Sequence, residues 1–300
     1  MKLSIFVRFF LICSVFTALG FLINNTEKAS EGQIFSDSST HNTQDKIYGV
    51  TLESVHTKFE KTLYSLINFS KKTTARVVFD NDETPAQYLD AIRRIHKVSY
   101  LMGELEDSYV MNDLSVPQYK KRAKQFIDVM GDEIDIWEIG NEVNGEWNGD
   151  IGDVTDKLKY SFKYAKSKNK KTAITLFYNK ECWQNQENEM FTWVDNSLPK
   201  EMIPGVDYVF VSYYDDHCNT TPDWQNVFDR LHQIFPNSKL GIGECGTRDK
   251  DKKEQYMKDY YNMKITTPNY VGGYFWWYFK NDCVPQSNHL WKVMNDVMGK

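Results

Sequence analysis

Short apolar runs alternate with longer amphipathic segments along the chain from residue 46 onward. The runs are rich in β-branched and aromatic residues, which predicts strands at 47–51, 75–79, 98–103, 135–142, 172–178, 207–214, 239–244 and 273–279. Each run is followed by a segment of helical period, the last at about residues 289–297. Eight repeated strand–helix units predict an α/β chain folded as a (β/α)₈ barrel.

An open, doubly wound parallel sheet is the alternative arrangement of the same units. That fold usually carries a Gly-rich phosphate loop after its first strand. None follows Tyr48-Gly49-Val50, so the barrel is favoured and a nucleotide site has little support.

The chain begins with a pattern typical of export. Lys2 and Arg8 precede an apolar run at residues 9–23, and Ala18-Leu19-Gly20 offers a small-x-small cleavage site. The run is shorter than the roughly 20 residues of a membrane span. We therefore interpret residues 1–23 as a signal peptide, with an uncleaved signal anchor as the alternative.

Residues 24–45 are polar and aperiodic and are predicted to be a disordered tether. The catalytic barrel is expected to occupy residues 46–300, a length that suits one such domain. The protein is expected to be secreted, periplasmic or extracellular, or else held at a membrane by residues 9–23.

Four cysteines lie beyond the signal segment, and an even number in an exported protein suggests two disulfides. They follow four successive predicted strands, in the order Cys182, Cys218, Cys245 and Cys283. Neighbouring loops would pair Cys182 with Cys218 and Cys245 with Cys283. Free buried thiols are the alternative.

The amino-acid composition and the net charge argue against some classes of function. Hydrophobic residues make up 41% and charged residues 26% of the chain, as in ordinary globular proteins. A net charge of −5 argues against a nucleic-acid partner, because that partner requires a basic surface. The 15% aromatic content suits either a packed core or surfaces that face sugar rings.

Two glutamates stand where catalytic groups of a barrel are expected. Glu142 ends the fourth predicted strand in the sequence WEIGNE, and Glu244 ends the seventh in GIGECG. Chemistry in this fold sits at the strand ends, so the two side chains are expected to face each other across the barrel mouth. Glycoside hydrolysis uses such a pair of carboxyl groups.

WEIGNE and GIGECG resemble the motifs of clan A glycoside hydrolases, which are retaining (β/α)₈ barrels. The resemblance implies that Glu142 is the general acid/base and Glu244 the nucleophile, about 5–5.5 Å apart. It also implies that Asn141 bonds the sugar 2-hydroxyl. Arg76, near the end of the second strand, would keep the nucleophile ionised.

Further substrate-binding residues follow from the same resemblance. Tyr214, on the same strand face as Ser212, is expected to bond Glu244. One of the two tryptophans Trp276 and Trp277 is expected to form the floor of the sugar site, and the other is expected to pack under a helix. Trp276 is favoured for the site. Trp147, in the loop after the fourth strand, is a candidate sugar contact.

The acidic clusters at strand ends match no standard metal site, so no metal or other cofactor is expected. Glu138 is expected inside the barrel or under a helix, and if it points inward it needs a partner that the sequence does not identify. The expected function is retaining hydrolysis of a β-linked poly- or oligosaccharide by a monomer. A transglycosylase using the same residues and a catalytically silent carbohydrate-binding barrel are the alternatives.

Overall fold

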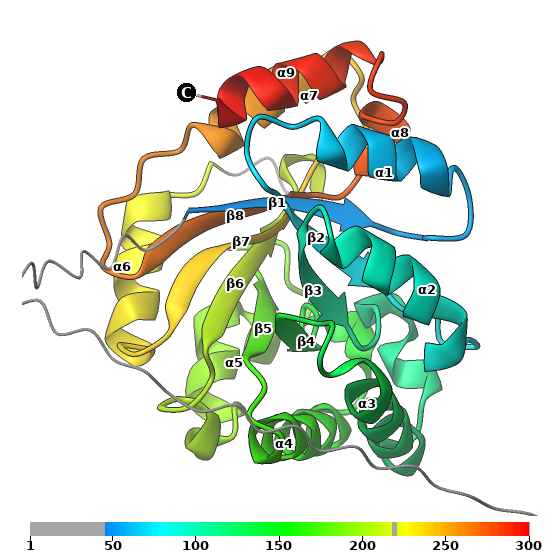
Figure 1. Cartoon of the computed structure of the whole chain (residues 1–300). Helices are drawn as coiled ribbons and strands as arrows, with labels where there is room; N and C mark the ends of the chain where they lie inside the picture. Colours follow the sequence, from blue (N-terminus) through cyan, green and yellow to red (C-terminus); the bar gives the residue numbers. More distant parts are fainter. Residues whose placement is uncertain (1–45, 218–220, 300) are drawn as a thin grey trace, which may run out of the picture. The chain divides into compact units, whose positions relative to one another are not determined.

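The computed structural model describes residues 46–217 and 221–299, and these form a closed eight-stranded parallel barrel (Figure 1). The strands pair in sequence order, and the barrel closes where the first strand pairs with the last. The strands are β1 (Ile47–Leu52), β2 (Thr74–Val78), β3 (Tyr100–Glu104), β4 (Ile136–Gly140), β5 (Thr172–Phe177), β6 (Tyr208–Tyr213), β7 (Lys239–Cys245) and β8 (Tyr270–Trp276). The predicted (β/α)₈ barrel is confirmed.

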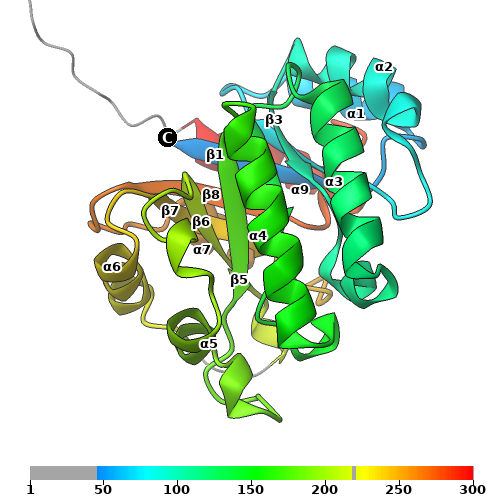
Figure 2. The ribbon, with the colours of Figure 1, turned by 90° about the horizontal axis from the view of Figure 1, so that it is seen from below.

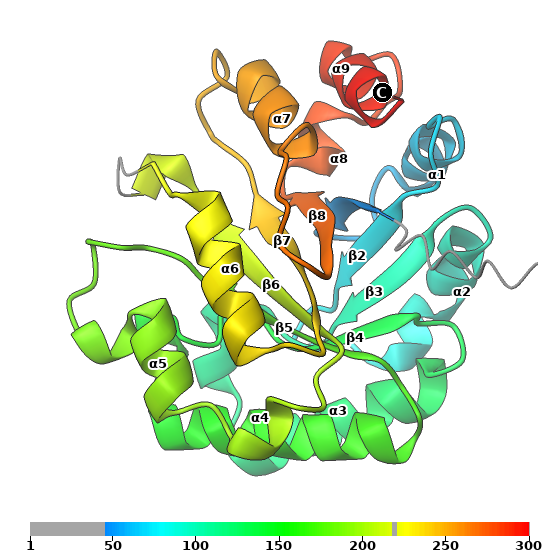
Figure 3. The ribbon, with the colours of Figure 1, turned by 90° about the vertical axis from the view of Figure 1, so that its left-hand side faces the viewer.

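Helices surround the barrel and cover the outer face of its strands (Figures 2 and 3). They are α1 (Phe59–Ile67), α2 (Pro85–His96), α3 (Val116–Met130), α4 (Ile151–Ser167), α5 (Met190–Asn196), α6 (Trp224–Ile234), α7 (Lys253–Tyr261), α8 (Phe279–Asp282) and α9 (His289–Met298). Two of them begin with a capping box, with Thr84 before α2 and Ser115 before α3. In both helices a proline occupies the first turn, where its missing N–H costs nothing.

Two apolar layers hold the barrel together. The larger fills the space between strands and helices, and the smaller lies inside the barrel around Met102, Phe210 and Phe275. Almost every strand residue is buried, as expected of a parallel sheet covered on both faces. Polar side chains therefore gather where the strands end.

The last strand departs from the prediction. The sequence pattern predicts a strand at 273–279, whereas β8 covers Tyr270–Trp276 and Phe279 begins α8. Gly272, Gly273 and Tyr274 all have positive φ, between 61° and 97°. This irregular backbone breaks the simple alternation of faces along β8. At Gly273 the backbone of Ile242 in the neighbouring strand leaves no room for a side chain.

The predicted signal segment, residues 1–23, and the predicted tether, residues 24–45, lie outside the described residues. Within the described part of the chain, no helix is long and apolar enough to cross a lipid bilayer.

Candidate active site

The two predicted glutamates lie at the same end of the barrel and are both nearly buried. Glu244 is part of β7, and Glu142 follows the last residue of β4 by two positions. Glu142 has φ of +42°, a left-handed conformation that is uncommon for residues with a Cβ. Such strained positions cluster at functional sites. The Asn148 amide donates to the Glu142 carbonyl at 2.7 Å and holds this turn in place.

Glu244 is surrounded by hydrogen-bond donors. Arg76 Nη1 donates to its Oε2 at 2.9 Å, Asn141 Nδ2 donates to the same oxygen at 3.4 Å, and the Tyr214 hydroxyl donates to its Oε1 at 2.5 Å. Burial raises the pKa of Glu244 to about 7, while Arg76 and Tyr214 act in the opposite direction. This set of donors stabilises a carboxylate.

Glu142 has weaker partners. The Ser212 hydroxyl donates to its Oε1 at 2.5 Å and the Ser108 hydroxyl to its Oε2 at 3.0 Å, and no cation contacts it within the described residues. Burial, and next the negative charge of Glu244, raise the pKa of Glu142 to about 8. The two carboxyl groups influence each other's ionisation, and their surroundings favour a proton on Glu142.

Arg76 lies in the barrel interior and contacts three carboxylates. Its Nε and Nη2 donate to both oxygens of Glu138, and its Nη2 lies 3.0 Å from Glu104 Oε2, in addition to the bond with Glu244. Thr175 also donates to Glu138. The partner of Glu138 that the sequence could not name is therefore Arg76. Burial raises the pKa of Glu104 well above its usual range.

A cavity of about 200 Å³ opens onto Glu142 and onto Tyr214, which bonds Glu244. Its lining residues are Tyr109, Glu142, Trp147, Phe177, Asn179, Tyr214, Arg248, Trp277 and Tyr278. Trp147 stacks on Tyr109 with ring centroids 5.9 Å apart, and its Nε1 is buried with no hydrogen-bond partner within the described residues. The flat aromatic faces of the cavity wall suit a sugar ring, which has apolar faces.

The tryptophan assignment at the end of β8 has to be reversed. Trp276 is fully buried between strands and helices, and its Nε1 donates to Asp282 at 2.9 Å. Trp277 lines the cavity and lies under Arg76, with the guanidinium 5.8 Å from its ring centroid. The preference for Trp276 was wrong because β8 ends at that residue, so the chain turns and the next side chain faces the mouth.

The cysteine predictions have different outcomes. Cys245 and Cys283 are both free thiols and both buried, so the predicted Cys245–Cys283 disulfide is wrong. Burial raises the pKa of each thiol well above its usual range, and each packs as an apolar side chain of the core. Cys182 is disulfide-bonded. Cys218 lies outside the described residues, so the pairing of Cys182 with Cys218 stays a prediction.

Sequence reasoning did not assign several residues of this site. Ser108 and Tyr109 come from a 3₁₀ turn (Ser108–Asp113) after β3, and Arg248 comes from the loop after β7. No motif marks these loops. Ser212 had a usable signal, since it shares a strand face with Tyr214, but its contact with Glu142 joins β6 to the end of β4, two strands that are not neighbours in the barrel.

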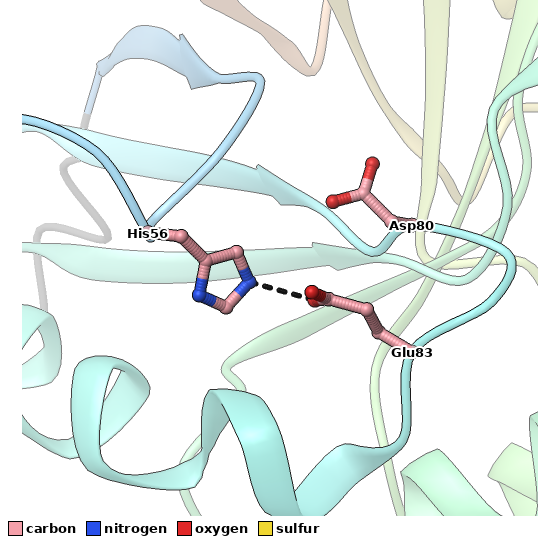
Figure 4. A group of neighbouring side chains, drawn as sticks. All are labelled: His56, Asp80 and Glu83. Atoms are coloured by element: carbon pink, nitrogen blue, oxygen red, sulfur yellow. Dashed lines mark hydrogen bonds and ion pairs between the residues drawn. The ribbon is translucent and has the colours of Figure 1, made fainter.

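One group with metal-ligand chemistry lies after β1 and β2. His56, Asp80 and Glu83 bring potential ligand atoms within 4.8 Å of one another (Figure 4). His56 Nε2 already pairs with Glu83 Oε2 at 2.7 Å, and Asp80 accepts a hydrogen bond from Tyr88. Each of the three side chains already has a hydrogen-bond partner, and we assign no metal to them.

Comparisons with known proteins support the fold. No family model and no curated protein matches the chain. Among solved structures, Gas2p of Saccharomyces cerevisiae in complex with laminaritriose and laminaritetraose is similar, with a TM-score of 0.54 and 12% identity over 85% of this chain and 64% of that chain. Its complex with laminaripentaose gives a TM-score of 0.54 and 13% identity over 85% and 65%.

The chain thus spans less than two thirds of the length of these Gas2p chains. A likeness at this identity establishes the architecture. That architecture agrees with the predicted (β/α)₈ barrel.

Proposed function

We propose that this protein is a retaining glycosidase that acts on a β-linked oligo- or polysaccharide. One observation carries the proposal: Glu142 and Glu244 lie at one barrel mouth in opposite surroundings. Glu244 receives bonds from Arg76 and Tyr214, whereas Glu142 meets only serine hydroxyls. Two carboxyl groups that differ in this way divide the roles of nucleophile and acid.

The proposed reaction proceeds in two displacements. Glu142 gives its proton to the glycosidic oxygen while the Glu244 carboxylate attacks the anomeric carbon, so the bond to the leaving group breaks and a glycosyl ester forms. Glu142, now ionised, takes a proton from a water molecule, which attacks the same carbon and releases Glu244. Asn141 bonds the sugar 2-hydroxyl, and Trp277 and Trp147 contact the ring faces.

The comparisons suggest where to begin with substrates. The Gas2p structures hold laminarioligosaccharides, and oligosaccharides of that kind are the first substrates to assay here. A transglycosylase would form the same glycosyl ester and pass it to a sugar acceptor. We expect the enzyme to be exported and to act as a monomer, without a cofactor.

Two glutamine variants test the assignment. Glu244→Gln should abolish turnover of every substrate, because the nucleophile is lost. Glu142→Gln should lose natural glycans but still form the glycosyl ester from dinitrophenyl glycosides, whose leaving group needs no proton. Glu146→Gln, in the same loop as Glu142 but bonded to the Asn185 backbone, is the matched control and should keep its activity.

A 2-deoxy-2-fluoro glycoside should leave a covalent adduct on the Glu244 peptide, detected by mass spectrometry. Near-normal hydrolysis by both glutamine variants would rule out the proposed chemistry. Products formed with and without an added sugar acceptor separate hydrolysis from transfer. Binding of laminarioligosaccharides without turnover or adduct would instead indicate a silent carbohydrate-binding barrel.

A further inference from the structure

The opposite end of the barrel carries a second, positively charged cavity. All eight strands are parallel, so their first residues meet at the end away from Glu142 and Glu244. A cavity of about 230 Å³ opens there, and its lining includes four lysines, namely Lys46, Lys72, Lys171 and Lys239. They come from the starts of β1, β2, β5 and β7, and a chain with a net charge of −5 concentrates positive charge at this end.

These lysines are not neutralised by the rest of the barrel. Among residues 46–217 and 221–299, no carboxylate lies within ion-pair distance of any of the four. The one acidic residue of the lining, Asp135, accepts a bond from the Leu101 backbone and lies 3.4 Å from His96. The cavity therefore offers cationic donors to an anion that the described barrel does not supply.

Aromatic rings support the lysines. Lys72 Nζ lies 4.1 Å from the centroid of the Tyr100 ring, and Lys239 Nζ lies 5.7 Å from that of Tyr208. Protein surfaces that contact anionic lipid headgroups carry clusters of basic residues. Tyrosine rings at such surfaces lie at the level of the headgroups.

Exposed apolar side chains gather at the same end. Each helix returns the chain to the start of the next strand, so the C-terminal ends of α1 and α3 lie beside the strand starts. Ile67 in the last turn of α1 is 60% exposed, Val129 in the last turn of α3 is 49% exposed, and Tyr100 at the start of β3 is 48% exposed. Few other large apolar side chains in the described residues are as exposed.

The position at which the chain enters the barrel favours a membrane surface as the source of the anion. The barrel begins at Lys46, within the cationic cavity, and the preceding sequence includes the apolar run at residues 9–23. If the apolar run is kept as a signal anchor, the alternative to a cleaved signal peptide, the chain that follows it joins the barrel at this end. We propose that the N-terminal end of the barrel binds the phosphate groups of an anionic membrane surface through Lys72, Lys171 and Lys239, leaving the catalytic mouth directed away from the lipid.

The full-length protein tests this in a vesicle sedimentation assay. Vesicles of phosphatidylcholine alone measure the contribution of the apolar run, and vesicles that also contain phosphatidylglycerol measure the contribution of charge. The Lys72→Gln, Lys171→Gln, Lys239→Gln triple variant should bind the anionic vesicles roughly a hundredfold more weakly than wild type, since each lysine near such a surface contributes about 1 kcal/mol. Its binding to phosphatidylcholine should not change.

Two further triple variants control for charge and for folding. Lys121→Gln, Lys180→Gln, Lys250→Gln removes the same charge from α3 and from the loops after β5 and β7, and should bind as wild type does. Lys72→Arg, Lys171→Arg, Lys239→Arg keeps the charge and should also bind. Equal binding of wild type to both kinds of vesicle, or unchanged binding by the first triple variant, would overturn the proposal.

Inorganic phosphate separates the two sources of a phosphate group. Sodium phosphate and sodium chloride at equal ionic strength should release the protein from anionic vesicles to the same extent, because both act by screening. Release by millimolar phosphate alone would identify free phosphate as the ligand and overturn the choice of a membrane.

Discussion

Arg76 Nη1 lies 2.9 Å from Glu244 Oε2, and the same guanidinium is bound on its other edge by Glu138. A planar fork can hold two carboxylates in fixed directions, which an ammonium group cannot do. Glu138 therefore orients Arg76, and Arg76 orients Glu244. Glu104 adds a third carboxyl group to the same cation, and burial raises the pKa of that group well above its usual range.

Arg76→Lys is expected to keep a positive charge but to lose this arrangement. Lysine cannot bond Glu138 and Glu244 in the same geometry, so the pKa of Glu244 should rise and the acid limb of kcat/KM should move to higher pH. We expect kcat to fall about a hundredfold and the free energy of unfolding to fall by about 2 kcal/mol, the value of charged hydrogen bonds. Rate–pH profiles and thermal melts measure both effects.

Arg93→Lys is the matched control, because that arginine pairs with Glu133 on an exposed helix surface. It should leave the rate, its pH profile and the melting temperature unchanged. An Arg76→Lys enzyme whose acid limb stays in place would show that Arg76 supports the fold without acting on Glu244.

The pH profile of the wild-type enzyme should be a narrow bell. The proposed mechanism requires ionised Glu244, whose pKa is about 7, and protonated Glu142, whose pKa is about 8. The rate therefore falls below the first value as Glu244 takes up a proton, and above the second as Glu142 loses its proton. Because the two carboxyl groups interact, the apparent pKa values of the two limbs describe the pair and not each residue alone. A broad plateau of kcat/KM from pH 4 to 6 would contradict this assignment of roles.

Ser212→Ala should move only the basic limb. The Ser212 hydroxyl donates to Glu142 and lowers the pKa of that residue. Without the bond the charged form loses stabilisation, so the pKa of Glu142 should rise and the basic limb should shift upward by about one pH unit, the equivalent of one hydrogen bond. The acid limb, set by Glu244, should stay where it is.

Ser161→Ala is a suitable control for this variant, since Ser161 is equally buried but bonds a backbone carbonyl of α4. A shift of both limbs in Ser212→Ala would indicate a general disturbance of the barrel mouth. An unmoved basic limb would show that Glu142 is not the group that must stay protonated.

The fold could be predicted because the same strand–helix pattern recurs along the sequence. Each strand–helix unit alternates a short buried run with an amphipathic segment, and eight such units leave few topologies open. The prediction failed locally at β8, where Gly272, Gly273 and Tyr274 adopt positive φ. Apolar patterning reports which residues are buried, and it does not report left-handed backbone at a residue such as Tyr274.

The site was predictable only where a strand carries it. Arg76 lies within β2, Glu244 lies near the end of β7, and Glu142 and Tyr214 come just after β4 and β6. The parallel barrel brings these positions together. Ser108 and Arg248 come from loops, whose course depends on tertiary contacts such as the Ser108 N–H bond to Asn141. The disulfide prediction at Cys245 failed for a related reason, because Cys245 is the last residue of β7 and Cys283 follows α8, and their order along the chain does not specify which way each side chain points.

The two adjacent tryptophans at the end of β8 should respond to substitution in opposite ways. Trp277 is half-buried in the cavity wall, so Trp277→Ala should remove a surface for the sugar and raise KM roughly tenfold, with little change in thermal stability. Trp276 is fully buried, so Trp276→Ala should lower the free energy of unfolding by about 3–5 kcal/mol. Trp276→Phe keeps most of the packing and should retain KM. Steady-state kinetics together with chemical denaturation distinguish the two roles, and a larger KM effect at Trp276 than at Trp277 in folded protein would restore the assignment that the sequence favoured.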